Sequence, residues 1–332
     1  MSASSSPTLP SGPYPALPGR VRHFVDRLRR GDEIAHVVTV IFAAGVILIT
    51  SLLVYVLWVN SSASRHTFGW KFFTTSVWDP VFEHFGALPF LYGTVVTSMV
   101  ALILAVPLGV GAAIFLAELA PPRLSDALAF VIDLLAAVPS VIYGVLGIFV
   151  VVPFVRDILA PFLQSTLGFL PIFKGPSYGI GLLTASLVLT IMIVPFIISV
   201  SREVLMAVPL DQREAALALG ATRWESTIRV VVPFARAGIT GSIFLAMARA
   251  LGETMAVTMV IGNDPKITSS LLAPGYTIAA VIANEFTEAT GTLYLHALIE
   301  LGLVLFLVTF ILNGLARLLI VSTEQRGGAS NA

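Results

Sequence analysis

The sequence predicts an all-α integral membrane protein with six transmembrane helices, and three observations support this class. Of the 332 residues, 57% are hydrophobic and only 11% are charged, whereas soluble domains carry about 25% charged residues. The mean hydropathy is +0.93. Six apolar stretches each reach the roughly 20 residues that a helix needs to cross the hydrocarbon core. Most of the folded surface is therefore expected to face lipid.

The predicted spans follow the apolar stretches in order. They lie at about residues 34–59, 90–116, 127–154, 179–200, 237–261 and 292–319. Pro107, Pro139 and Pro195 fall inside three of them, and neighbouring helices can satisfy the backbone groups that a proline frees in a membrane. These prolines are therefore predicted to kink their helices rather than end them. Two weaker apolar segments, 159–173 and 277–286, are expected at the interface or against the outer face of the bundle.

The distribution of basic residues predicts the orientation. If the amino terminus is cytoplasmic, most Lys and Arg residues fall in inner segments, as the positive-inside rule requires, so both termini are predicted to be cytoplasmic. The expected organisation has four parts. These are a disordered tail at 1–19, rich in Ser and Pro, a basic segment at 20–33, a transmembrane domain at 34–320 and a cytoplasmic tail at 321–332.

Composition also excludes several functions. The net charge of zero argues against a general nucleic-acid binder. The chain has no cysteine, and its five histidines do not show metal-ligand spacing, so we predict no metal site. It has no G-x-x-x-x-G-K-[ST] phosphate-binding loop, so the chain itself is not expected to hydrolyse ATP or to be an enzyme.

The longest inner connection carries consistent signals for two short helices at the membrane surface. Pro209 suits the first turn of a helix, and Gly220 suits a left-handed terminating position. Thr222 and Glu225 match a capping box for the second helix, which is expected to end near Pro233. These residues predict a helix–turn–helix.

We refer to residues 207–233 as the coupling loop. Its alanines leave a small-residue surface that could enter a groove on another protein, although an amphipathic linker resting on lipid would have the same composition. The segment resembles the EAA loop of ABC importer permeases, and the matching residues are Glu214, Ala215, Ala216, Gly220 and Pro233. The resemblance implies that this loop docks into a cleft of a separate ATPase subunit, which binds ATP and Mg. It implies no cofactor on this chain.

A wider resemblance narrows the substrate. Residues 134–154, 249–263 and 273–286 resemble the permease pair of the phosphate-specific ABC importer, the PstC-like member more than the PstA-like one. The resemblance implies a type I importer permease fold (MetI-like) in the bacterial plasma membrane, forming half of a path for inorganic phosphate. The implied partners are a homologous second permease (PstA-like), a dimeric ATPase (PstB-like), an extracytoplasmic phosphate-binding protein (PstS-like) and membrane lipid.

Two charged residues fall within the fifth predicted span. Arg249 follows Arg236 by about thirteen residues, or roughly 20 Å of helix, and Glu253 is predicted one turn further on the same face. An ionised side chain at mid-membrane costs at least about 2.5–3.5 kcal/mol. Either the two neutralise each other, or both line a substrate path in which Arg249 attracts an anion.

The carboxylate suggests a selectivity hypothesis. Phosphate keeps one or two protons near neutral pH and can donate a hydrogen bond to Glu253, whereas sulfate cannot. Ser140 and Tyr143, beside Pro139, could bind an oxyanion, or they could satisfy backbone freed at the kink. Asp133 and Glu300 are equally compatible with pairing to neighbouring helices and with lining the cavity.

Three other functions fit the residues. The first is an ABC permease for another small solute, such as molybdate or an amino acid. The second is a proton-coupled secondary phosphate transporter that uses Arg249 and Glu253 as a relay. The third is a membrane scaffold or sensor without transport.

Overall fold

The computed structural model describes residues 32–328; the predicted tail at 1–19, most of the basic segment and residues 329–332 lie outside this range. Within it, six helices are long and apolar enough to cross a membrane, which confirms the predicted number of spans. They are Ala35–Asn60, Leu88–Leu119, Ser140–Leu167, Leu182–Met206, Arg223–Leu251 and Thr292–Leu315. The chain divides into two compact units, residues 1–56 and 57–332.

The described part of the first unit is a single helix. Helix α2 (Asp32–Asn60) has 29 residues and continues a few residues into the second unit. Its apolar side chains are exposed on every face; Phe42, for example, is 72% exposed. A helix that is hydrophobic all round is stable only when apolar material surrounds it, and here lipid is the natural surrounding.

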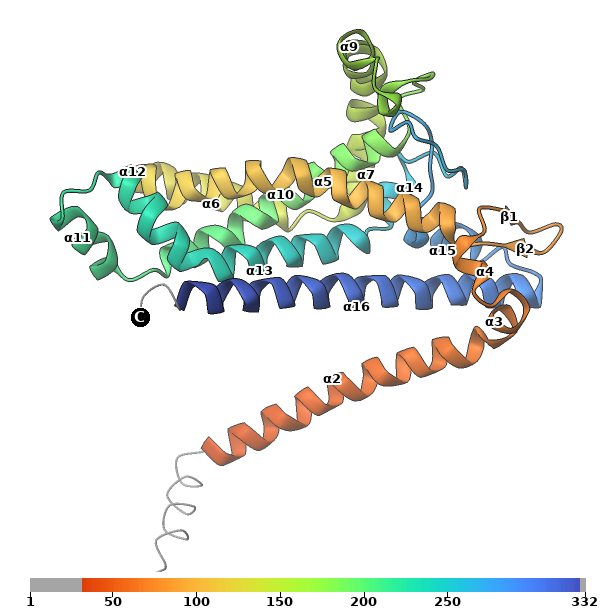
Figure 1. Ribbon diagram of the computed structural model, residues 1–332, viewed down its shortest axis with the longest axis horizontal. Coiled ribbons are helices and arrows are strands. Elements are labelled where there is room, and N and C mark those ends of the chain that lie inside the picture. The colour runs from red at the N-terminus through yellow and green to blue at the C-terminus, as the bar shows by residue number, and fades with distance from the viewer. Residues whose placement is uncertain (1–31, 329–332) are drawn as a thin grey trace, which may run out of the picture. The chain divides into compact units, whose positions relative to one another are not determined.

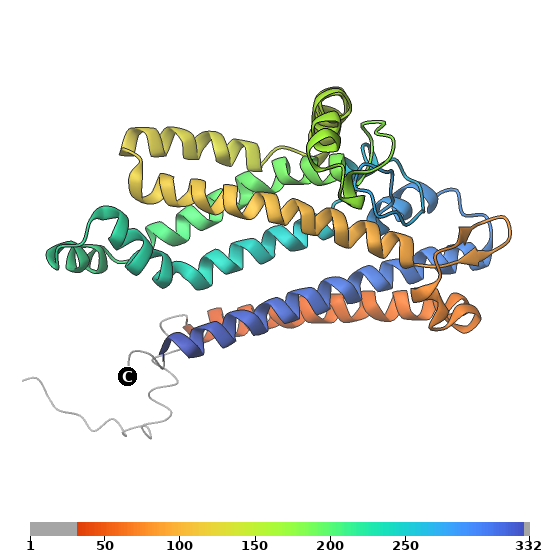
Figure 2. The same ribbon diagram turned by 45° about the horizontal axis from the view of Figure 1, so that its top comes forward.

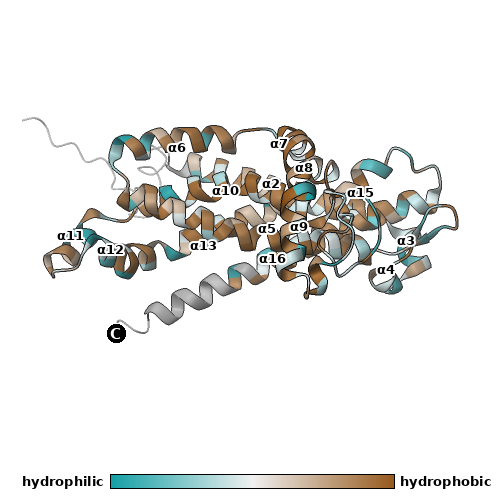
Figure 3. Ribbon diagram, turned by 90° about the horizontal axis from the view of Figure 1, so that it is seen from above, coloured by the Kyte–Doolittle hydropathy of each residue, from teal (hydrophilic) through white to brown (hydrophobic). Residues whose placement is uncertain are grey.

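The second unit is a helical bundle with short elements at both ends (Figures 1 and 2). Its long helices are α5 (Leu88–Ile114), α6 (Pro122–Ala136), α10 (Leu182–Met206), α13 (Val232–Leu251) and α16 (Thr292–Gly328). One end carries α11 (Leu210–Ala218) and α12 (Arg223–Ser226), where hydrophilic residues are frequent (Figure 3). The other end carries α3 (Ser62–Phe68), α4 (Lys71–Thr74) and an antiparallel hairpin, β1 (Trp78–Asp79) and β2 (His84–Phe85).

Helix α10 lies at the centre of the main core. Leu189, Ile193 and Ile197 on this helix are fully buried, and they belong to a cluster that also draws on α5 and α13. Gly109 of α5 allows close contact, because a Cβ there would lie 2.7 Å from the Cγ2 atom of Ile197. Small residues let membrane helices approach in this way. Pro107 and Pro195 lie inside α5 and α10, as predicted, and neither ends its helix.

An aromatic cluster closes the hairpin end. Trp78 Nε1 and the Tyr294 hydroxyl both donate to Glu285 Oε2, at 2.8 and 2.6 Å. The carboxylate lies at the end of α15 (Ile278–Glu285), whose Ile278 is fully buried. The alternative that 277–286 packs against the outer face is therefore wrong, because this short helix is part of the core, while the interfacial alternative stays a prediction.

Single π-helical turns recur ahead of prolines. The π segments η1 (Phe115–Leu119), η2 (Gly147–Val151), η3 (Val155–Leu159) and η5 (Thr227–Val231) each end two residues before Pro121, Pro153, Pro161 or Pro233. The residue just before each proline donates to the carbonyl five positions back. A proline ring clashes with the carbonyl four positions back, and the wider π turn relieves that clash.

The backbone around the third span corrects three sequence predictions. The third span is Ser140–Leu167 rather than 127–154, because Pro139 has extended backbone (ψ 139°) and separates α6 from α7 (Ser140–Leu146). Pro139 is thus a helix boundary. The predicted weak segment 159–173 begins as the end of this span, in α9 (Ala160–Leu167).

The fifth span is also displaced. It runs through Pro233 as Arg223–Leu251, because the π turn accommodates the proline, so the second loop helix does not end there. It stops at Leu251 instead of continuing to 261, and Gly252 caps it.

Candidate functional site

Two helix breaks meet inside the bundle. One separates α6 from α7 at residues 137–139, and the other separates α13 from α14 (Met255–Thr258) at 252–254. Gly144 allows α7 to pack directly on α14, since a Cβ there would lie 2.5 Å from Met259 Sδ and 3.1 Å from the Cα atom of Ala256. Discontinuous helices of this kind are typical of substrate sites in transporters.

Arg249 and Tyr143 lie on the helices that flank these breaks. Arg249 lies in the last turn of α13, half-buried, with its Cζ atom 5.9 Å from the ring centroid of Phe196 on α10, within reach of a cation–π contact. Tyr143 is buried in the core cluster against which Phe196 packs. The Tyr143 hydroxyl donates to the Leu135 carbonyl at 2.7 Å, so it satisfies backbone at the end of α6, one of the two predicted roles.

Glu253 does not lie on the same helix face as Arg249. The helix has ended at Leu251, and the Glu253 Oε1 atom accepts the Ala256 N–H at 3.1 Å. The ion pairs among the described residues are Arg156–Asp157, Arg202–Asp126, Arg213–Glu118 and Lys266–Asp264. The neutralising Arg249–Glu253 pair is therefore not formed, while a substrate-path role for each residue stays a prediction.

The other polar candidates occupy different surroundings. Ser140 is half-buried at the first position of α7. Asp133 on α6 accepts a hydrogen bond from the Ser199 hydroxyl of α10 at 2.7 Å, which matches the pairing alternative. Glu300 on α16 is only 2% exposed and so does not line an open cavity.

The coupling loop has the predicted local structure. Helix α11 begins immediately after Pro209, and Gly220 has φ +89°. The Glu225 N–H donates to Thr222 Oγ1 at 3.3 Å, and the Thr222 N–H donates to Glu225 Oε2 at 2.9 Å. These two bonds form the capping box at the start of α12.

The loop presents an unpartnered apolar surface. Glu214, Ala215 and Pro233 are exposed, Leu219 is 90% exposed, and Trp224 is 56% exposed. A groove of about 420 Å³ between α11 and α12 is lined by residues that include Ala216 and Gly220. Exposed apolar patches with polar surroundings mark binding surfaces, so this face is suited to another protein.

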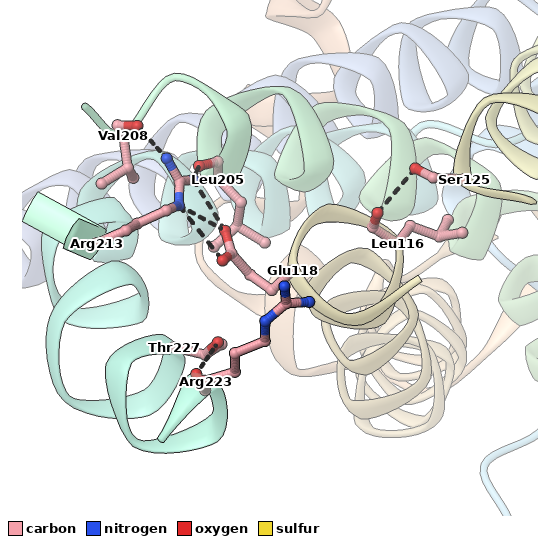
Figure 4. Close-up of polar contacts among 8 residues, drawn as sticks. All are labelled: Leu116, Glu118, Ser125, Leu205, Val208, Arg213, Arg223 and Thr227. Atoms are coloured by element: carbon pink, nitrogen blue, oxygen red, sulfur yellow. Dashed lines mark hydrogen bonds and ion pairs between the residues drawn. The ribbon is translucent and has the colours of Figure 1, made fainter. Parts of the chain in front are cut away.

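Sequence reasoning missed a partly buried ion pair beneath this surface. Arg213 of α11 contacts Glu118 at 2.9 Å (Nη2 to Oε1), with side chains only 17% and 10% exposed. Its guanidinium also donates to the carbonyls of Leu205, at 2.8 Å, and Val208. Figure 4 shows the guanidinium between these groups. The available signal was an acidic residue at the end of an apolar stretch, which requires a partner.

A second polar cluster lies nearby. The Ser125 hydroxyl of α6 donates to the Leu116 carbonyl at 2.8 Å, as Figure 4 also shows. Arg202 of α10 donates to the Ser125 oxygen at 3.1 Å and pairs with Asp126 at 3.3 Å. The π turn η1 at the end of α5 is therefore held from two sides.

Comparison with known proteins gives consistent matches. Residues 105–323 match the family model described as "Binding-protein-dependent transport system inner membrane component". The "Phosphate transport system permease protein PstC" of Mesorhizobium japonicum is 47% identical over 92% of this chain and 94% of its own length. The protein of that name from Xylella fastidiosa is 48% identical over 78% of this chain and 81% of its own length. The one from Haemophilus influenzae is 46% identical over 87% of this chain and 93% of its own length. A solved inward-facing MetNI methionine ABC transporter aligns with a TM-score of 0.49 at 17% identity, covering 69% of this chain and 93% of that chain.

Proposed function

Because the chain belongs to the family of binding-protein-dependent transport system inner membrane components, we propose that it is the permease subunit of an ATP-driven importer of inorganic phosphate. The observation that carries the substrate is the 46–48% identity to relatives named as phosphate transport permeases, over most of the chain. The family itself is the one that Glu214, Ala215 and Gly220 of the coupling loop predicted. This subunit forms half of the path and does no bond chemistry.

The proposed path passes the two helix breaks. Arg249 supplies a permanent positive charge with a planar fork of donors that suits a phosphate oxyanion, and Tyr143 and Ser140 lie on the neighbouring helix. Glu253 would accept a hydrogen bond from protonated phosphate. The support is geometric: Arg249 lies over Phe196, which packs against the core cluster that contains Tyr143, and Glu253 lies in the break that follows the same helix as Arg249.

The coupling loop supplies the motion. We place this loop and both chain ends in the cytoplasm of a bacterium, with the membrane-spanning bundle in its plasma membrane. The exposed surface around Glu214 and Leu219 docks on an ATPase subunit that binds ATP and Mg. A homologous second permease completes the path, and an external binding protein delivers phosphate to the opposite end. Closure of the ATPase dimer would then switch the site between two accessible states.

Uptake by the reconstituted complex tests the proposal. The chain, its second permease and its ATPase are purified together, placed in vesicles and supplied with binding protein, ATP and labelled phosphate. Uptake should require ATP, should resist an uncoupler and should be competed by phosphate but not by sulfate, molybdate or amino acids. Uptake that collapses with an uncoupler while ATP is maintained would identify a proton-coupled transporter instead.

The selectivity hypothesis has its own variant. Glu253→Gln keeps an oxygen that can accept the Ala256 N–H but removes the charge, so the local backbone is preserved. Phosphate uptake should fall, or sulfate should begin to compete. Unchanged phosphate uptake with sulfate still rejected would refute the role of Glu253.

A further inference from the structure

One guanidinium joins three structural elements at the loop end of the bundle. Arg213 belongs to α11, and its partner Glu118 belongs to η1 at the end of α5. The Leu205 carbonyl lies in the last turn of α10, and the Val208 carbonyl lies just beyond that helix. Figure 4 shows this convergence around the guanidinium. α11 itself contributes only Arg213 to the link; its partners all come from other elements.

Local helix energetics do not explain the position of Glu118. It lies in the π turn that continues α5, where the last carbonyls already place negative charge, so a carboxylate is unfavourable there. A buried carboxylate also needs a partner to offset lost hydration. The interaction with Arg213, 95 residues away in the sequence, compensates both costs. The carboxylate therefore connects α5 to the coupling loop, although its position is unfavourable for α5 itself.

The carbonyl contacts require an arginine in particular. The last carbonyls of a helix have no partner within it. The Leu205 carbonyl of α10 accepts the Val208 N–H at 3.3 Å, and Arg213 donates to that carbonyl as well as to the Val208 carbonyl just beyond the helix. A planar fork with five donors can serve the carboxylate and both carbonyls at once, whereas a lysine ammonium acts as a point charge. The geometry thus distinguishes Arg from Lys at this position.

The elements that Arg213 contacts, η1 and the end of α10, belong to helices that pack beside the helix breaks. Helix α5 packs along α10 in the main core, and α10 carries Phe196 beneath Arg249. The second cluster, in which the Ser125 hydroxyl holds the Leu116 carbonyl, ties α6 to the same π turn. A displacement of η1 would therefore reach the elements that flank the candidate site.

We propose that Arg213 and Glu118 are positioning residues that make α11, η1 and the end of α10 move as one body. Through them, a displacement of the docked coupling loop is passed to α5 and α10 together. This inference rests on the proposed import function and adds to it the connection that turns ATP hydrolysis into movement of the site. Without the pair, the ATPase would still dock and hydrolyse ATP, but the loop would move independently of the bundle.

The test measures labelled phosphate imported and ATP hydrolysed in the same vesicles, with the complete complex. In Arg213→Lys and Glu118→Gln, the ATPase should co-purify at parental levels and hydrolysis should continue. Phosphate moved per ATP should fall roughly fivefold or more, the lower end of typical coupling effects. The control is Asp157→Asn, which breaks the exposed Arg156–Asp157 pair (53% and 57% exposed) and should leave the ratio unchanged.

A tethered variant separates a mechanical role from a structural one. The chain has no cysteine, so Glu118→Cys with Arg213→Cys provides two unique thiols, used with cysteine-free partner subunits. The reduced form should be uncoupled, and a short bifunctional thiol reagent should restore the ratio of phosphate moved per ATP toward the parental value.

Four outcomes would overturn the proposal or the function beneath it. An unchanged ratio of phosphate moved per ATP in Arg213→Lys and Glu118→Gln would overturn the proposal, as would a completed cross-link without recovery of that ratio. Loss of the folded chain or of the ATPase from both single variants would assign the pair to folding and also overturn it. If the unmodified complex imported no phosphate, the proposed function itself would fail.

Discussion

The coupling loop and the two helix breaks both interrupt regular helix, but they satisfy their backbone groups in different ways. In the loop, the Thr222–Glu225 capping box and Gly220 at φ +89° complete the helix ends with residues a few positions away. At the α6–α7 break, the Leu135 carbonyl is satisfied by Tyr143, and α7 packs on α14 at Gly144. The loop is therefore locally stabilised with its outer face open to a partner, whereas the breaks depend on tertiary packing. Substitutions on the loop surface should weaken docking, and with it transport, without changing the stability of the chain, whereas substitutions at the breaks should alter both stability and transport.

The largest effect is expected at the docking surface. Glu214 is exposed, so Glu214→Lys should change the stability of the chain by no more than about 0.5 kcal/mol. At a docked interface, a like-charge contact costs several kcal/mol, so retention of the ATPase during purification and phosphate uptake should both be lost. Glu288→Lys, also exposed but far from the loop, is the matched control. Equal loss of ATPase retention and uptake in both variants would show that the effect is not specific to the docking surface.

A methyl group at the contact between the breaks should act differently. In Gly144→Ala the new Cβ would lie 2.5 Å from Met259 Sδ, and overpacking of this kind costs about 1–3 kcal/mol. The thermal midpoint and phosphate uptake should both fall, while the ATPase stays bound. Gly111→Ala has nothing within 4 Å and should be neutral or stabilising. A fall in ATPase binding with an unchanged thermal midpoint would contradict the assignment of Gly144 to packing between the breaks.

The turn of the coupling loop offers a purely conformational test. Gly220 has open space around its Cα, so a substitution meets only the backbone penalty for positive φ, about 1–2 kcal/mol for alanine. Affinity for the ATPase in nanodiscs should fall about tenfold, equivalent to 1.4 kcal/mol. In Gly220→Asn the affinity for the ATPase should fall less, because asparagine tolerates the left-handed region. Equal affinities for the two variants would mean that the loop can dock in another conformation.

The smallest effect is expected from a single hydrogen bond. Tyr143→Phe keeps the ring but removes the bond to the Leu135 carbonyl, and such a loss typically costs about 0.5–1.5 kcal/mol. The thermal midpoint should drop slightly, and uptake should drop without a change in ATPase binding. A variant with parental stability and uptake would show that the break is held by packing around Gly144 alone.

These two regions also explain which features could be predicted from sequence. The six spans follow from apolar length, and the loop follows from Pro209, Gly220 and the Thr222–Glu225 pair, because water-exposed helix ends need local caps. The breaks leave no such trace. The chain is similarly apolar on both sides of Pro139, so the third span was placed too early, and nothing in the composition marked the stop at Leu251.

The candidate site was predicted in part. Arg249 was singled out because an intramembrane charge is conspicuous in any sequence, and Tyr143 because it stands beside Pro139. Both are linked to Phe196, Arg249 by lying over its ring and Tyr143 through the core cluster. The relation of Glu253 to Arg249 was wrong, since it assumed an unbroken helix through Gly252. The Arg213–Glu118 pair spans 95 residues, and only the tertiary fold could reveal it.

The π turns ahead of Pro121, Pro153, Pro161 and Pro233 have a consequence for angular phase. At Pro153, Pro161 and Pro233 the helix continues past the turn. There the turn accommodates one additional residue, so the residues beyond it are offset by about 100° from a straight α-helical count at 3.6 residues per turn. A helical wheel drawn straight from Arg223 to Leu251 would thus assign Arg249 to the wrong azimuth. Deleting one residue within Thr227–Val231 would return the turn to regular α-helix, so the Arg249 guanidinium would keep its direction about the helix axis. An equal deletion in the α-helical segment between Val232 and Arg249 would instead swing it by about 100°.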